Sequence, residues 1–144
     1  MATQRKSSRF KDAISTSNAV LIATPEYNGM VPGALANAID WASRPPGRSV
    51  LRNKLVAIMG AVVGRSGSQN AQAILRGVLG RIGAIVVPDP LVLVPHVSKL
   101  FDEHVDLRDE QTREQIRQLV EALVHWCQRI QPEDPTSRPK VAHP

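Results

Sequence analysis

The sequence predicts an α/β protein with a parallel sheet, and two observations carry this prediction. Three short apolar runs rich in β-branched residues are continuous rather than alternating, as strands covered on both faces require. These runs span residues 19–24, 55–60 and 84–87, and segments with helical periodicity separate them. Strands that alternate with helices are typical of βαβ units, whose crossovers make a sheet parallel.

Four helices are expected from the spacing of apolar residues. A short helix over about 8–17 precedes the first strand, and a second helix begins at Pro32, whose missing N–H would be unbonded in a first turn. A third begins near Gln69 and places Ala71, Leu75 and Leu79 on one face. The last helix runs over about 109–130.

The domain organisation is expected to be simple. The chain of 144 residues has the size of one domain, and we predict a single domain over 1–130. Residues 91–94 follow Pro88-Asp-Pro90 and are expected to extend the third strand. The prolines and balanced charges of residues 131–144 predict a disordered tail.

Composition excludes several classes of protein. The net charge of +5 comes mainly from basic residues before Asp12, and aromatic residues make up only 3%, which argues against nucleic-acid binding. No apolar run approaches the roughly 20 residues that cross a bilayer, so no membrane partner is expected. Cys127 is the single cysteine, and no histidine shows metal-ligand spacing, so we predict no metal site and a reducing, cytoplasmic location.

Two loops at the carboxyl ends of predicted strands are the candidate functional site, because open parallel sheets bind ligands at that edge. The first loop, residues 24–33, contains an Asn28-Gly29 pair that tolerates positive φ. The second loop, residues 60–68, carries three glycines that would let a planar ligand approach the backbone, and Ser66 or Ser68 could cap the helix that follows. The residues alone predict either a site for a flat ligand or nucleotide, or merely well-formed turns.

The stretch TPEYNGMVPGALANAIDWASRP, residues 24–45, resembles the signature of the NADPH-dependent FMN reductase family. The Ala71-Gln72 and Leu75-Arg76 pairs after the second loop are similar to the next motif of that family. The family includes quinone, chromate and azo-dye reductases on a flavodoxin-like fold. The resemblance therefore implies a three-layer α/β/α architecture with bound FMN and with NADPH or NADH as electron donor. It also implies a quinone, azo or metal-oxyanion acceptor and a homodimer or homotetramer.

The resemblance also implies which residues form the cofactor site. The first loop would hold the isoalloxazine ring largely through backbone groups, and residues 61–64 would approach the ring from the second loop. No catalytic acid or base is implied, because the flavin carries the chemistry. The implied cofactor-binding residues are Pro25, Glu26, Tyr27, Asn28, Ala61, Val62, Val63 and Gly64.

One departure from the family pattern affects both fold and function. Members of the family begin with a strand, a phosphate-binding loop, a helix and a second strand, and none of these is found in the 18 residues before Ala19. We therefore expect the first two of the usual five strands to be missing and residues 19–24 to form an exposed edge. An alternative function follows, in which a shortened, non-catalytic relative acts as a subunit or interaction module.

Overall fold

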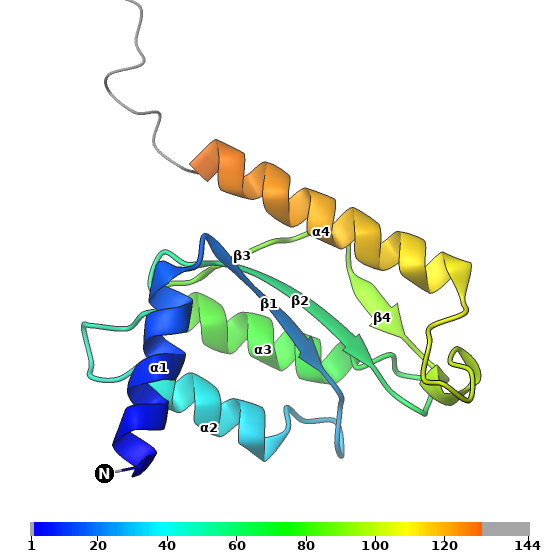
Figure 1. Cartoon of the computed structure of the whole chain (residues 1–144), viewed down its shortest axis with the longest axis horizontal. Coiled ribbons are helices and arrows are strands. Elements are labelled where there is room, and N and C mark those ends of the chain that lie inside the picture. Colours follow the sequence, from blue (N-terminus) through cyan, green and yellow to red (C-terminus); the bar gives the residue numbers. More distant parts are fainter. Residues whose placement is uncertain (1, 131–144) are drawn as a thin grey trace, which may run out of the picture.

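The computed structural model describes residues 2–130, in which one sheet lies between two layers of helices (Figure 1). The predicted tail over 131–144 lies outside the described residues. The elements follow one another in the order α1 (Ala2–Thr16), β1 (Ala19–Thr24), α2 (Gly33–Ala42), β2 (Leu55–Ala61), α3 (Gln69–Ile82), β3 (Ile85–Val86), β4 (Val92–Val94), a 3-10 turn (Val97–Lys99) and α4 (Glu110–Ile130).

The predicted helices are all present, and one of them differs at its start. The first helix begins at Ala2 rather than near residue 8. The second begins at Gly33 with Pro32 as its N-cap, so the proline carbonyl accepts the first hydrogen bond of the helix, from the amide of Ala36 at 3.0 Å. The two later helices begin and end within one residue of the expected positions.

All strand pairs of the sheet are parallel, and β2 is the central strand. It pairs with β1 over six residues, from Ala19 opposite Leu55 to Thr24 opposite Gly60. On its other side it pairs first with β3 and then with β4. Residues 92–94 thus form a separate strand, β4, that continues along β2 beyond β3, rather than the unbroken extension of the third strand expected over 91–94. Pro88 and Pro90 interrupt this line because proline has no N–H to donate to a ladder.

Two side chains of α3 hold the connection between β3 and β4. Gln72 is buried, and its Nε2 donates to the carbonyl oxygen of Val92 at 2.9 Å. Arg76 Nη1 donates to the carbonyl oxygen of Val87 at 2.7 Å. Burial lowers the pKa of this guanidinium from its usual value. The interrupted strand thus stays on the sheet through side-chain bonds where the backbone ladder is missing.

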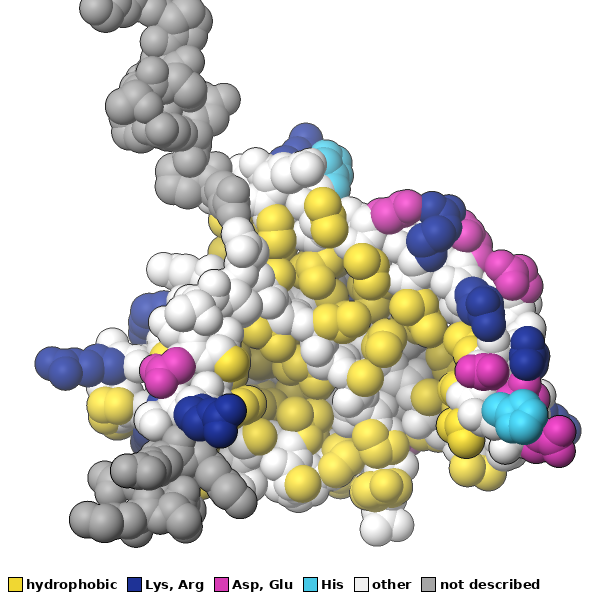
Figure 2. Space-filling view, in the orientation of Figure 1, with side chains coloured by type: hydrophobic (Ala, Val, Ile, Leu, Met, Phe, Trp, Pro, Cys, Tyr) yellow, Lys and Arg dark blue, Asp and Glu magenta, His cyan; other side chains and the backbone are white. Residues whose placement is uncertain are grey.

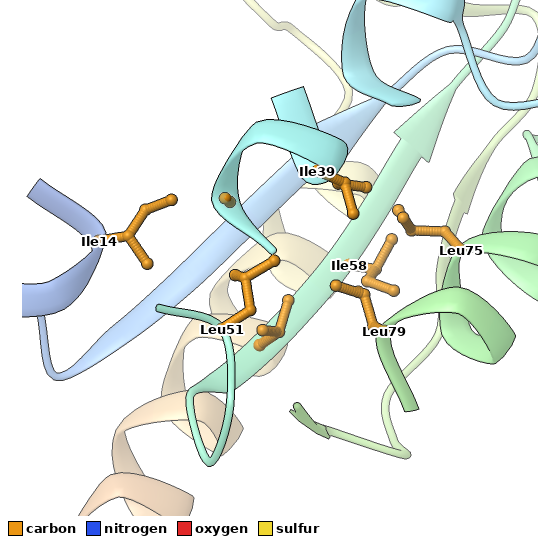
Figure 3. Packing of buried hydrophobic residues seen from close by; sticks show 8 residues of the cluster. Ile14, Ile39, Leu51, Ile58, Leu75 and Leu79 are labelled. Carbon is orange, nitrogen blue, oxygen red and sulfur yellow. The ribbon is translucent and has the colours of Figure 1, made fainter. Parts of the chain in front are cut away.

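A hydrophobic core lies on each face of the sheet, which confirms the three-layer α/β/α architecture. On one face, α1, α2 and α3 contribute Ile14, Ile39 and Leu75 to a cluster around Ile58 of β2 (Figure 3). On the other face, Leu119 of α4 packs with residues of β2 and β4. Because both faces of β2 are covered, its Val56, Ala57 and Ile58 have no exposed surface.

The first strand, β1, is more exposed than its apolar composition alone would indicate. It lies at an edge of the described sheet, as expected, and pairs with β2 alone. Leu21 of β1 is 38% exposed and Phe10 of α1 is 41% exposed. Hydrophobic side chains gather on the face that carries this edge, between α4 and the helices of the opposite layer (Figure 2). The absence of two further strands stays a prediction.

Leu75→Ala should destabilise the protein by about 2–5 kcal/mol, because Leu75 is fully buried and its truncation leaves a cavity. The neighbouring substitution Ile74→Ala is the matched control, since Ile74 is 37% exposed and should cost less than about 1 kcal/mol. Urea unfolding followed by circular dichroism measures both. Equal losses of stability in the two variants would contradict this packing.

Candidate functional site

The first loop turns sharply after β1. The backbone amide and carbonyl of Tyr27 each bond to those of Met30, at 3.1 and 2.9 Å. The two residues between them, Asn28 and Gly29, have φ angles of 52° and 72°. Positive φ at both central positions is typical of a type I′ turn, for which Asn-Gly is a favoured pair. The expectation of an Asn-Gly turn with positive φ is therefore confirmed.

The three glycines of the second loop have different surroundings. A Cβ on Gly60 would lie 1.7 Å from Ser68 Oγ and 2.6 Å from the carbonyl oxygen of Thr24. A Cβ on Gly67 would lie 2.9 Å from the Cβ of Leu93. A Cβ on Gly64 would meet nothing within 4 Å. Gly60 and Gly67 are thus required by internal packing, whereas Gly64 leaves its backbone open to a ligand.

The carboxylate of Glu26 joins the first loop to the beginning of α3. Its Oε2 accepts hydrogen bonds from the backbone amides of Asn70, at 2.8 Å, and Ala71, at 3.0 Å. The bond from the Ala71 amide is the main reason that the pKa of Glu26 lies below its usual value, and bonds from Ser66 and Asn70 act in the same direction. Burial opposes this shift without cancelling it, so the net direction of the shift is downward.

The expectation that Ser66 or Ser68 caps α3 is wrong. Ser68 occupies the N-cap position with a φ of 70°, and its side chain makes no capping hydrogen bond. Its buried hydroxyl instead accepts a bond from Gln72 Nε2 at 3.2 Å. The first amides of the helix bond to Glu26, a residue that no local sequence pattern connects with this helix.

A cavity of about 450 Å³ lies between the two loops, at the carboxyl ends of β1 and β2. This volume is within the usual range for small-molecule sites, about 300–1,000 Å³. The parallel pairing of Thr24 with Gly60 brings the loops together, because this is the last pair of residues that joins β1 to β2. Seven of the eight predicted site residues line it; they are Pro25, Glu26, Tyr27, Ala61, Val62, Val63 and Gly64.

The remaining predicted residue, Asn28, does not line the cavity and is exposed in the turn. Ser66 and Val97 line the cavity without having been predicted as site residues. Val97 belongs to the turn after β4, and its amide donates to the carbonyl oxygen of Val62 at 3.0 Å. Its position depends on β4 pairing with β2, which no local sequence signal near Val97 indicates.

A second, apolar cavity of about 300 Å³ adjoins the first on the side of α4. The two cavities share Pro25, Ala61 and Val97 in their linings. The hydroxyls of Thr24 and Thr112 in the second cavity are already bonded, to the Pro25 carbonyl at 2.9 Å and to Asp109 at 2.6 Å. The second cavity therefore offers mainly hydrocarbon surface to a ligand.

Two other kinds of site are absent from the described part of the chain. Within residues 2–130, no group of three or more His, Cys, Asp or Glu side chains could hold a metal ion. None of the helices in that part is long and apolar enough to cross a membrane.

Comparisons with known proteins agree with the fold. The model of the NADPH-dependent FMN reductase family matches residues 2–99. An NAD(P)H-dependent FMN reductase from Pseudomonas aeruginosa is 41% identical over 122 residues, which cover 85% of this chain and 65% of the relative. A 2-hydroxy-1,4-benzoquinone reductase from a Burkholderia species is 38% identical over 117 residues, covering 81% of this chain and 64% of the relative.

Among solved structures, the flavoenzyme FerB from Paracoccus denitrificans, an NAD(P)H:(acceptor) oxidoreductase, is similar with a TM-score of 0.78. It is 34% identical, and the match covers 87% of this chain and 69% of FerB. The fold thus defines a flavodoxin-like α/β protein, with a cavity at the carboxyl ends of its strands as the candidate ligand site. The chain belongs to the NADPH-dependent FMN reductase family. It spans about 65% of the length of the Pseudomonas relative.

Gly60→Ala should destabilise the protein by about 1–3 kcal/mol, because the new methyl group would overlap Ser68 and the backbone of Thr24. Gly64→Ala is the control, since its methyl group would meet no atom and should leave stability within about 0.5 kcal/mol of the parent. Thermal unfolding of the three proteins measures the difference. A Gly60→Ala variant as stable as the parent would contradict the close approach of the loops.

Proposed function

We propose that this chain forms the flavin site of an NAD(P)H-dependent FMN reductase that passes electrons to a small acceptor. FMN, when bound, would accept a hydride from NADPH or NADH and deliver electrons to a quinone, azo compound or metal oxyanion. The protein supplies the binding surface, the orientation of the reactants and the exclusion of water. We further propose that residues 1–130 act as one partial flavodoxin-like domain.

The single observation that carries this proposal is the cavity between the two loops. Seven residues that the family resemblance assigns to the cofactor line it together, although they come from segments far apart in the sequence. The names of the relatives, an FMN reductase and a benzoquinone reductase, support the same chemistry.

The residues that line the cavity fit a planar ring. Pro25, Val62 and Val63 supply apolar surface, and Gly64 leaves room for a ring to approach the backbone. Val63 is 70% exposed and Tyr27 is 63% exposed, so a bound ring would cover apolar surface that now contacts water. The Glu26 carboxylate is hydrogen-bonded to the first turn of α3, so it does not stand unpaired in the cavity.

We also propose that the protein acts in the cytoplasm as a homodimer or homotetramer. The reducing location is supported by the single cysteine, Cys127, which is free. Assembly is supported by large apolar side chains on the outer surfaces of α2 and α3, where Trp41 is 49% and Val78 is 40% exposed.

The proposal predicts that the purified chain binds FMN with a Kd in the low micromolar range or tighter, about −8 kcal/mol. Quenching of flavin fluorescence during a titration measures the affinity, and NADPH-driven bleaching of the flavin then tests turnover. Absence of binding at about 100 μM FMN by folded protein would instead favour the shortened, non-catalytic alternative.

Gly64→Leu should weaken FMN binding more than about tenfold, because its side chain would extend into the space that the ring requires. Gly80→Leu is the matched control. Gly80 lies on the exposed surface of α3, where an added Cβ likewise meets nothing within 4 Å. Fluorescence titration of both variants gives the comparison. Equal affinities in the two variants would exclude the cavity as the flavin site.

A further inference from the structure

The two loops that line the cavity belong to different βα units, and the carboxylate of Glu26 bridges them. Its partners, Asn70 and Ala71, lie 44 and 45 residues further along the chain, in the first turn of α3. Glu26 Oε1 also accepts a longer bond from Asn70 Nδ2 at 3.4 Å. Hydrogen bonds to an ionised carboxylate are about twice as strong as those between neutral groups.

The beginning of α3 needs such a partner. The first amides of an α-helix have no acceptor within the helix, and a residue at the N-cap usually supplies one from its side chain. Ser68 cannot do so, because its hydroxyl is buried against Gln72 and lies where any side chain on Gly60 would be. The partial positive charge at the helix N-terminus also favours a carboxylate at this position.

The first loop, in turn, has little packing to hold it. Tyr27 is 63% and Met30 is 55% exposed, so the turn between them is open to solvent. The backbone bonds between these two residues stabilise the turn itself without attaching it to the second loop. Glu26, at the base of the turn, provides that attachment.

We propose that Glu26 is a positioning residue, whose carboxylate ties the first loop to α3 and holds the cavity at the width a flavin ring needs. This inference rests on the proposed function. It assigns to the side chain a role distinct from contact with the flavin, since both carboxylate oxygens are already bonded to α3. A ring that enters a cavity of preset width binds more tightly, because less loop ordering accompanies binding.

Glu26→Ala and Glu26→Gln separate the contribution of the hydrogen bonds from that of the negative charge. The alanine variant removes both acceptors and should raise the Kd for FMN about tenfold, whereas the glutamine variant retains one neutral acceptor and should raise it about threefold. Glu114→Gln is the control: Glu114 is also a hydrogen-bonded carboxylate with a lowered pKa, but it lies on α4 and does not line the cavity. The Kd of the Glu114→Gln variant for FMN should match that of the parent.

Two further readouts test this role, one for direct contact with the reactants and one for the bond to α3. The first is the split between affinity and rate: in Glu26→Ala the Kd for FMN should change by a larger factor than the rate of acceptor reduction at saturating FMN, because the carboxylate is bonded to the first turn of α3. Amide hydrogen exchange measured by NMR should show faster exchange at Asn70 and Ala71 in that variant. The core amides of Ile58 and Leu75 should stay protected.

Each outcome decides the inference. An unchanged Kd in Glu26→Ala, or unchanged exchange at Asn70 and Ala71, overturns it. A large loss of rate at saturating FMN also overturns it, because Glu26 would then contact the flavin or the substrate. If the parent itself binds no FMN while the two amides respond to the substitution, the proposed function and the flavin role fail together, and the bond between loop and helix stands as a structural contact.

Discussion

The close approach of β1 and β2 at Thr24 and Gly60 is the constraint on which the candidate site depends. Parallel pairing places these two residues opposite one another at the last rung of the ladder. Gly60 has no side chain, so Ser68 packs directly onto the strand, and this contact sets the start of α3. The loops after both strands therefore leave the sheet side by side. The cavity, the Glu26 bond and the open backbone at Gly64 all follow from that arrangement.

The arrangement also explains why the site is built mostly from backbone and apolar groups. Polar side chains near it are used internally: Thr24 bonds to Pro25, Ser68 to Gln72 and Glu26 to α3. What remains facing the cavity is mainly apolar side chains and a glycine, with Tyr27 and Ser66 beside them, and this lining suits a flat ligand that carries its own reactivity. A site of this kind needs accurate spacing of its walls more than it needs titratable groups.

The edge along β1 is the place where the observed burial of side chains differs most from what their apolar character would predict. The run over residues 19–24 has the composition of a strand covered on both faces, yet Leu21 remains 38% exposed and β1 pairs on one side only within the described sheet. Figure 2 shows apolar side chains gathered on the face of the molecule that carries β1. By contrast β2, with the same kind of sequence, is enclosed because it has neighbours on both sides.

Local sequence patterns were sufficient for the elements and for most of the cavity lining. Periodicity located α3 and α4 to within one residue, since the buried face of a helix repeats along the chain. The Asn28-Gly29 pair predicted its turn because few other pairs adopt positive φ twice. The resemblance to the family implied the site residues, and strand pairing brings seven of them to one cavity.

Contacts between distant segments needed the tertiary structure. The cap of α3 was assigned to Ser66 or Ser68 because caps are usually local, whereas the bonding partner, Glu26, is 44 residues away from Asn70. The same limit applies to Val97, which reaches the cavity only because β4 pairs with β2. The residues of this chain thus determine its helices, strands and turns through short-range periodicity. The width of the cavity and the bond across it arise from strand register and helix placement, which no short segment encodes.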